Sequence, residues 1–156
     1  MECKERLERY LRDNLVAYRV QHHPRAYTAQ EVAESEHVPG RLLAKVVMAY
    51  ADDAPAMLVL RADHQVEIEA ARAALGARSL RLAHEEEFGA LFPDCEIGAM
   101  PPFGNLYGLA VVVDQALAED DTIVFQAGTH SDTMSVRYAD FARLAQPRVA
   151  RFATHV

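Results

Sequence analysis

The residue with the clearest chemical potential is Lys45, which interrupts an apolar run. The run reads Leu42-Leu43-Ala44-Lys45-Val46-Val47-Met48, and Lys45 is one of two lysines beside 14 arginines. Lysine is rarely fully buried, so one interpretation is an edge lysine whose amine faces solvent. In the alternative, the ammonium group stands at the rim of an apolar pocket and holds a phosphate or carboxylate as a point charge.

A second feature is the segment Gly98-Ala99-Met100-Pro101-Pro102-Phe103-Gly104. Its prolines fix their φ angles and lack N–H groups, whereas Gly98 permits backbone angles that other residues avoid. Such a loop could direct the N–H groups of Gly98, Ala99 and Met100 into a cleft and stabilise a developing oxyanion. Plain turns have the same composition, so the segment alone does not decide between the two interpretations.

A third feature is Gly128-Thr129-His130-Ser131-Asp132, which lies between two apolar segments and is typical of a hairpin tip. His130 and Asp132 are either solvated turn residues or groups that reach over the mouth of a pocket. Ser131 follows His130 directly, so in an extended segment the two side chains point apart.

Other chemical signatures are missing from the sequence. The histidines form no HExxH motif and no Cys/His cluster has zinc spacing, so we expect no metal. The chain has no GxSxG, GxGxxG or P-loop motif, which argues against a serine hydrolase elbow and a nucleotide cofactor. Cys3 and Cys95 form no CxxC pair and are expected to be two ordinary thiols, although the sequence does not exclude a bond between them.

The elements that must position these features follow from hydrophobic periodicity. It predicts helices over 2–14, 28–36, 66–75, 84–92 and 138–145, and strands over 16–22, 42–50, 56–62, 79–82, 108–114, 122–125 and 133–136. The Thr28-Ala29-Gln30-Glu31 capping box begins the second helix, and Asp52-Asp53-Ala54-Pro55 makes a hairpin turn. This irregular alternation favours a mixed α/β (α+β) fold with a mixed sheet flanked by helices.

Length and composition favour one folded domain, residues 1–156. The chain is 51% hydrophobic, no apolar run approaches the ~20 residues of a membrane span, and its first residues are charged and helical. We therefore expect a soluble, cytoplasmic protein without a membrane partner. The net charge is −7, and residues 83–136 carry ten acidic and no basic side chains. That balance argues against gripping a long duplex such as DNA, but it leaves contact with one short nucleic-acid end open.

Taken together, the motifs resemble the YbaK/EbsC family, which includes the editing domain of bacterial prolyl-tRNA synthetases. The resemblance covers about residues 18–149. It rests on five segments in order: 23–33 (HPRAYTAQEVA), 40–47 (GRLLAKVV), 60–64 (LRADH), 98–108 and 127–136.

The resemblance implies a central barrel-like sheet and a metal-free, cofactor-free hydrolase. Its substrate would be the ester of a wrong, small amino acid at the 3′ end of a transfer RNA, with the ribose hydroxyl helping the attacking water. Lys45, Gly98 and Pro102 match the family's functional lysine and loop ends. Further residues are placed near the substrate: Tyr27, Thr28, Val46, Ala99, Met100, Phe103 and His130.

The chain departs from the family pattern at two points. Some alanine-clearing relatives carry Asn after the lysine, where this chain has Val46, and Met100-Pro101 adds bulk to the loop. The sequence therefore leaves open which amino acid and which transfer RNA are used, and a monomer is compatible with it. The alternative function is a non-catalytic module that binds a nucleotide, an aminoacyl-adenylate-like ligand or a protein in the same pocket.

Overall fold

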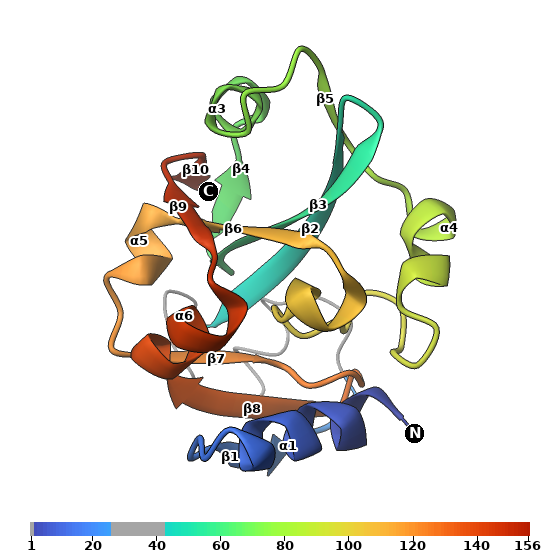
Figure 1. The fold of residues 1–156 in the computed structure, drawn as a ribbon, viewed down its shortest axis with the longest axis vertical. Coiled ribbons are helices and arrows are strands. Elements are labelled where there is room, and N and C mark those ends of the chain that lie inside the picture. The colour runs from blue at the N-terminus through green and yellow to red at the C-terminus, as the bar shows by residue number, and fades with distance from the viewer. Residues whose placement is uncertain (1, 26–42) are drawn as a thin grey trace.

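The structure, a computed structural model, describes residues 2–25 and 43–156 (Figure 1). The expected helix 28–36 lies outside these residues, as do Tyr27 and Thr28. The helices are α1 Cys3–Asp13, α3 Ile68–Ala74, α4 Glu85–Phe88, α5 Gln115–Ala118 and α6 Tyr138–Ala145, with 3-10 turns η1 Gly89–Leu91 and η2 Gly104–Tyr107. The strands are β1 Arg19–His22, β2 Ala44–Ala51, β3 Ala54–Arg61, β4 His64–Val66, β5 Leu80–Leu82, β6 Ala110–Asp114, β7 Thr122–Gln126, β8 Asp132–Arg137, β9 Arg148–Ala150 and β10 Ala153–His155.

The strands in the described part of the chain form three sheets, and one of them is mixed. The largest has the order β5-β2-β3-β6-β9, with β3, β6 and β9 mutually parallel and the other pairs antiparallel. A three-stranded antiparallel sheet has the order β1-β8-β7, and β10 pairs with β4. The mixed α+β expectation is thus confirmed.

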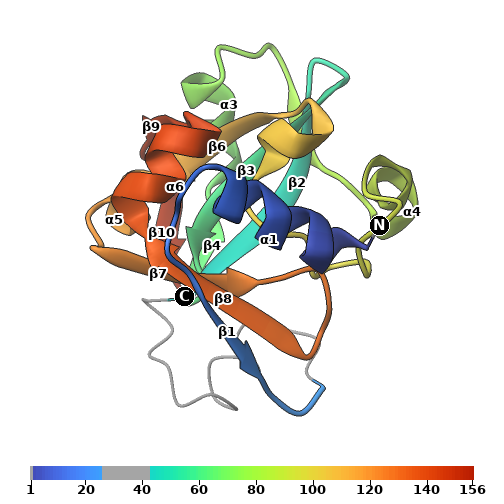
Figure 2. The same cartoon turned by 60° about the horizontal axis from the view of Figure 1, so that its bottom comes forward.

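The expected barrel does not close among the described residues. The five-stranded and three-stranded sheets meet at one isolated bridge, Leu43 with Val124. Figures 1 and 2 show α1 packed beside the three-stranded sheet, with β1 running along β8. The result is two sheets around a shared core rather than a continuous ring of strands.

The predicted hairpin is confirmed with a shorter turn. Ala51 pairs with Ala54, so Asp52 and Asp53 are the two turn residues, and both have positive φ angles of 49° and 68°. Two left-handed residues are the geometry that matches the right-handed twist of adjacent strands. The Asp52 carboxylate also accepts hydrogen bonds from the backbone N–H groups of Arg78 and Ser79, which lowers its pKa.

The main core lies between the two larger sheets and beneath two helices. α1 contributes Leu7 and Leu11, both fully buried, while Leu15 lies beyond the helix end with a φ of 59° and is 92% exposed. Leu15 therefore lies outside the buried apolar face of the helix. A second, smaller cluster packs α3 and Phe152 against the other face of the five-stranded sheet. None of the helices in the described ranges combines the length and apolar character that a membrane crossing requires.

Candidate functional site

The Gly98–Pro102 loop has a defined backbone conformation. Gly98 has a φ of +87°, which L-residues avoid, and Ala99 to Pro102 are buried. The Gly98 N–H donates to the Met100 sulfur at 3.3 Å, and the Ala99 N–H donates to the Glu96 carbonyl at 3.0 Å. The expectation that three amides point freely into a cleft is therefore wrong for two of them. Within the described ranges, the Met100 amide is the one left without a partner.

The 128–132 hairpin is hydrogen-bonded to the loop and to Glu96 just before it, and we call this bonded unit the clasp. The Gly128 N–H donates to the Ala99 carbonyl, the Glu96 N–H donates to the Gly128 carbonyl, and both distances are 2.9 Å. The His130 N–H donates to the Glu96 carboxylate at 2.9 Å, and His130 Nε2 lies 2.7 Å from the Ile97 carbonyl oxygen. Because a carbonyl only accepts, this contact requires a proton on Nε2.

Gly98 and His130 are thus brought into direct contact. A Cβ added at Gly98 would lie 3.5 Å from the His130 ring carbon Cε1. The histidine is buried, with 5% of its surface exposed. His130 is therefore not a solvated turn residue; it packs against the loop and contacts the Ile97 carbonyl.

The base of the same hairpin holds a buried carboxylate, Asp132. Its oxygens accept the Thr129 hydroxyl at 2.6 Å and face the Lys4 ammonium at 3.5 Å, and the exposed His22 ring forms an ion-pair contact with it. Burial raises the pKa of Asp132, but the Thr129 hydrogen bond and the charges of Lys4 and His22 outweigh burial and lower the pKa overall. No local pattern links Lys4 or His22 to Asp132, because tertiary packing places Lys4 there and the β1–β8 register brings His22 opposite Asp132.

Lys45 lies on β2 as expected, but the structure does not bring its amine to the loop. The ammonium donates to the Ala62 carbonyl at 3.4 Å and is half-buried. Desolvation lowers the pKa of Lys45, and the nearby Asp63 carboxylate only partly offsets this. Val46 packs in the cluster that contains Met100. Because side chains alternate along a strand, Lys45 projects toward the opposite face.

The other expected lining residues in the described ranges lie in the main core. Phe103 is fully buried and makes edge-to-face ring contacts with Tyr10, Phe125 and Phe141 at centroid distances of 6.2, 5.7 and 5.3 Å. Met100 is 4% exposed and Val46 is partly buried. Phe103 thus anchors the end of the loop in the main core, and Val46 and Met100 belong to the same cluster.

Cys3 and Cys95 form a disulfide, which differs from the expected pair of ordinary thiols. The fold joins them because the N–H of Cys3 donates to the Asp94 carbonyl at 3.0 Å, which seats the start of α1 on the chain just before the loop. Asp94 and the two cysteines are also grouped closely enough for a metal ion. With the sulfurs bonded to each other, no thiolate is available to bind one.

A cavity of about 220 Å³ opens beside the disulfide. Its lining combines the start of α1, the chain before the loop and the hairpin: Glu2, Cys3, Lys4, Pro93, Asp94, Cys95, Glu96, Gly128 and Thr129. The disulfide and the hairpin therefore both line this cavity.

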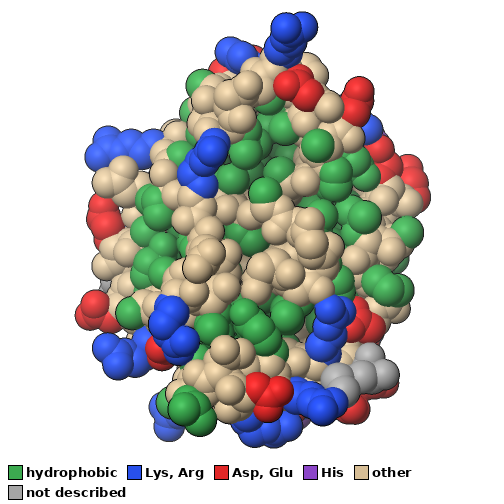
Figure 3. Space-filling model, in the orientation of Figure 1, with side chains coloured by type: hydrophobic (Ala, Val, Ile, Leu, Met, Phe, Trp, Pro, Cys, Tyr) green, Lys and Arg blue, Asp and Glu red, His purple; other side chains and the backbone are tan. Residues whose placement is uncertain are grey.

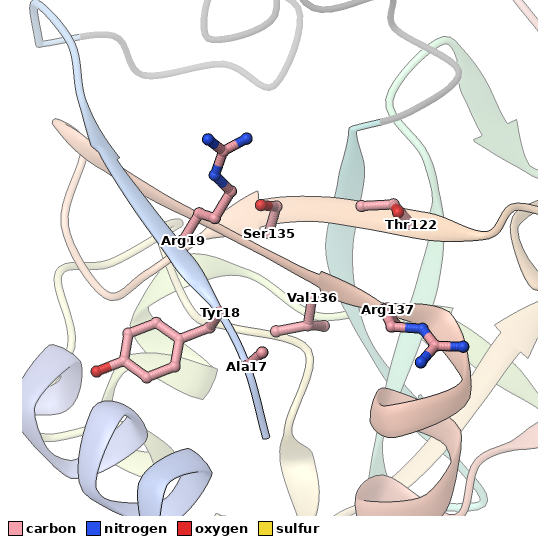
Figure 4. Close-up of a pocket in the computed structure, with 7 residues that line it drawn as sticks. All are labelled: Ala17, Tyr18, Arg19, Thr122, Ser135, Val136 and Arg137. Atoms are coloured by element: carbon pink, nitrogen blue, oxygen red, sulfur yellow. The ribbon is translucent and has the colours of Figure 1, made fainter. Parts of the chain in front are cut away.

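Two arginines of the three-stranded sheet have no carboxylate partner among the described residues. Arg19 and Arg137 line a groove of about 220 Å³ with the hydroxyl-bearing Thr122 and Ser135, and Figure 4 shows Arg19 and Ser135 on the same side of the strands. Three other arginines are already occupied by carboxylates: Arg61 with Asp120 at 3.1 Å, Arg72 with Glu69 at 2.9 Å and Arg81 with Glu87 at 2.7 Å. On the face shown in Figure 3, the Lys and Arg side chains stand in separate groups rather than in one patch.

Comparison with known proteins gives a consistent result. Residues 23–144 match the family model of the aminoacyl-tRNA editing domain. The multifunctional Ser/Thr-tRNA deacylase ProXp-y of Escherichia coli (strain K12) is 33% identical over 97 residues, which are 62% of this chain and 58% of that protein. The match thus spans less than two thirds of that relative.

Two solved structures show the same fold. Hypothetical protein APE2540 has a TM-score of 0.86 at 17% identity, covering 95% of this chain and 99% of its own. A candidate trans-editing enzyme for prolyl tRNA synthetase has a TM-score of 0.85 at 19% identity, covering 99% and 98%.

Proposed function

Because the chain belongs to the aminoacyl-tRNA editing domain family, we propose that it is a deacylase that hydrolyses a small amino acid from the 3′ end of a mischarged transfer RNA. In this reaction a water oxygen attacks the ester carbonyl carbon. The bond to the ribose oxygen breaks, that oxygen takes up a proton, and a free amino acid leaves. The family pattern assigns activation of the water to the neighbouring ribose hydroxyl, so no metal or cofactor enters the proposal.

The observation that carries the proposal is the clasp between the Gly98–Pro102 loop and the His130 hairpin. Backbone catalysis needs donors whose position is fixed before the substrate arrives, because reorganisation would cancel their benefit. The left-handed Gly98, the buried prolines and the 2.7 Å contact from His130 to Ile97 supply such rigidity. We assign the remaining donor to the Met100 N–H, and Val46 and the Met100 side chain limit the room for the amino acid.

The nucleic-acid part of the substrate would be held by separate cations. We assign Lys45 to a phosphate of the terminal nucleotides, on the flank of the site, since its amine faces away from Met100. We assign Arg19 and Arg137 to a phosphate farther along the acceptor end, because their guanidinium groups have no carboxylate partner within the described residues. Tyr27 and Thr28 remain substrate-side residues on the family pattern alone.

The test is hydrolysis of a panel of transfer RNAs charged with serine, threonine, alanine or a correct amino acid. We expect release of at least one small, wrong amino acid well above the buffer rate, with the correct ester spared. Gly98→Val serves as the control, because a β-branched side chain at a positive φ distorts the loop. No hydrolysis of any ester by the folded protein would refute the deacylase.

A binding module is the second candidate, and one observation favours it. The Gly98 and Ala99 amides are both occupied inside the loop, so little of the expected donor set is open. This candidate predicts saturable binding of an uncharged or charged acceptor end without turnover. Measuring binding and hydrolysis on the same substrates therefore separates the two functions.

A further inference from the structure

The Cys3–Cys95 disulfide ties two distant parts of the chain at the loop. The cysteines are 92 residues apart, and Cys95 lies three residues before Gly98. Cys3 is the first residue of α1, so the bond fixes the start of that helix to the chain that enters the loop. The Gly128 backbone lies against it, since a Cβ added there would come within 2.8 Å of both Cβ and Sγ of Cys3.

The residues that follow Cys95 carry the effect of this bond into the clasp. Glu96 alone makes three of the contacts: its N–H donates to Gly128, its carbonyl accepts from Ala99, and its carboxylate accepts from the His130 N–H. A change in the position of Cys95 would therefore move the residue on which loop and hairpin both depend.

The disulfide is open to attack from one side. The cavity of about 220 Å³ is lined by both cysteines, and Cys95 is partly exposed whereas Cys3 is 2% exposed. The Tyr107 hydroxyl lies 3.5 Å from the Cys3 sulfur and 3.2 Å from that of Cys95, and it donates to Asp94 at 2.8 Å. A thiolate that leaves from Cys3 would thus lie beside a hydroxyl that can turn its one proton from Asp94 to the sulfur.

We propose that Cys3 and Cys95 form a thiol–disulfide exchange site, open to small dithiols, whose redox state controls the order of the Gly98–Pro102 loop. The thiolate of a dithiol attacks Cys95 Sγ, the bond between the two sulfurs breaks, and Cys3 leaves as a thiolate that takes up a proton. The second thiol of the reductant then attacks its own mixed disulfide. Cys95 is released as a thiol, and the reductant, having lost two electrons, becomes a cyclic disulfide.

In the oxidised state the disulfide bonds the start of α1 to Cys95 and so restricts the movement of Glu96 and the clasp. In the reduced state the covalent brace is lost while the hydrogen bonds remain, so the loop samples more conformations. The exchange chemistry stands on the geometry alone, whereas its effect on catalysis rests on the proposed deacylase function. Coupling between two such sites typically changes a rate or affinity by about 5-fold or more.

The first experiment follows the protein without any substrate. The full chain is equilibrated in dithiothreitol buffers of graded ratio, alkylated and weighed, and its amide hydrogen exchange is measured in both end states. We expect two alkylated thiols in the reduced state alone, and at least 5-fold faster exchange at residues 96–100 and 128–130. Free thiols after equilibration in oxidised buffer, or equal exchange at these residues in both states, would overturn the proposal.

The second experiment adds deacylation in both end states, with Cys3→Ser and Cys95→Ser as matched controls. We expect a rate at least 5-fold lower for the reduced protein, and variants whose rates match the reduced protein and do not respond to dithiothreitol. A redox-dependent rate in either variant would contradict the assignment. Absence of hydrolysis in every state, together with redox-dependent exchange, would refute the deacylase but keep the exchange site.

Discussion

Replacing Gly98 by alanine should separate backbone strain from catalysis. The residue has a φ of +87°, and an added Cβ would lie 3.5 Å from His130 Cε1, an ordinary van der Waals contact. No clash therefore contributes, and the cost is the left-handed conformation itself, about 1–2 kcal/mol for a residue with a Cβ. We expect Gly98→Ala to lower the free energy of unfolding by about that amount, or to relax by rotating the peptide that holds Ile97 against His130.

The chain contains a matched control for this strain. Gly76 has a φ of +63°, lies beyond the end of α3, and an added Cβ there would meet nothing within 4 Å. Gly76→Ala should lose a similar 1–2 kcal/mol of stability without touching the loop. Urea denaturation of both variants measures the strain, and single-turnover deacylation of a mischarged transfer RNA measures the catalytic effect.

The two variants should agree in stability and differ in rate. A displaced oxyanion donor typically costs about 10²–10³ in rate, so Gly98→Ala should fall by at least ten-fold while Gly76→Ala stays near wild type. Equal rates for the two variants, at equal losses of stability, would show that the Gly98 loop is an ordinary turn. The proposed mechanism would then lose its main structural support.

Three further predictions concern the charged groups and the chemistry. Lys45→Met should raise KM about ten-fold or more with little change in kcat, because it removes a charge-assisted contact of about 1.5–3 kcal/mol. Because burial lowers the pKa of Lys45, the wild-type KM should begin to rise at a pH below 10.5. A pH-independent KM would contradict the assignment of Lys45 to a phosphate. Asp132→Asn should lower the free energy of unfolding by about 1–3 kcal/mol at pH 7. Because the pKa of Asp132 is lowered in the folded state, its contribution to stability is complete above the unfolded-state pKa and disappears as pH falls below about 3.8. Urea titrations of variant and wild type should therefore converge below that pH. Deacylation should survive EDTA, and a loss that zinc restores would reject the mechanism.

Much of the fold could be predicted because local signals were strong. The α1 periodicity and the hairpin around Asp52-Asp53 both appear in the structure. Strands β4, β9 and β10 were missed, since runs of three residues give little periodicity. Their place is set instead by the buried Asp114, whose carboxylate accepts the N–H groups of Phe152 and Ala153.

The candidate site was harder to predict, because its contacts are tertiary. The sequence indicated that Gly98 and His130 matter, but not that Glu96 joins them. Strand alternation puts Lys45 and Val46 on opposite faces of β2. The sequence did not show which of these faces is turned toward the loop. The Cys3–Cys95 bond could not be foreseen, since no spacing rule connects residues 92 positions apart.

The pairing of β1 with β8 has a consequence for how the protein is made. His22 lies opposite Asp132, 110 residues later, so β1 has no partner until most of the chain has been synthesised. At a synthesis rate of about 5–20 residues per second, β1 waits roughly 6–20 seconds. During that interval the amphipathic α1 exposes Leu7 and Leu11 on the ribosome-bound chain, where chaperones that bind apolar segments would meet it first. The three-stranded sheet therefore forms only after the β2–β3 hairpin has had time to form.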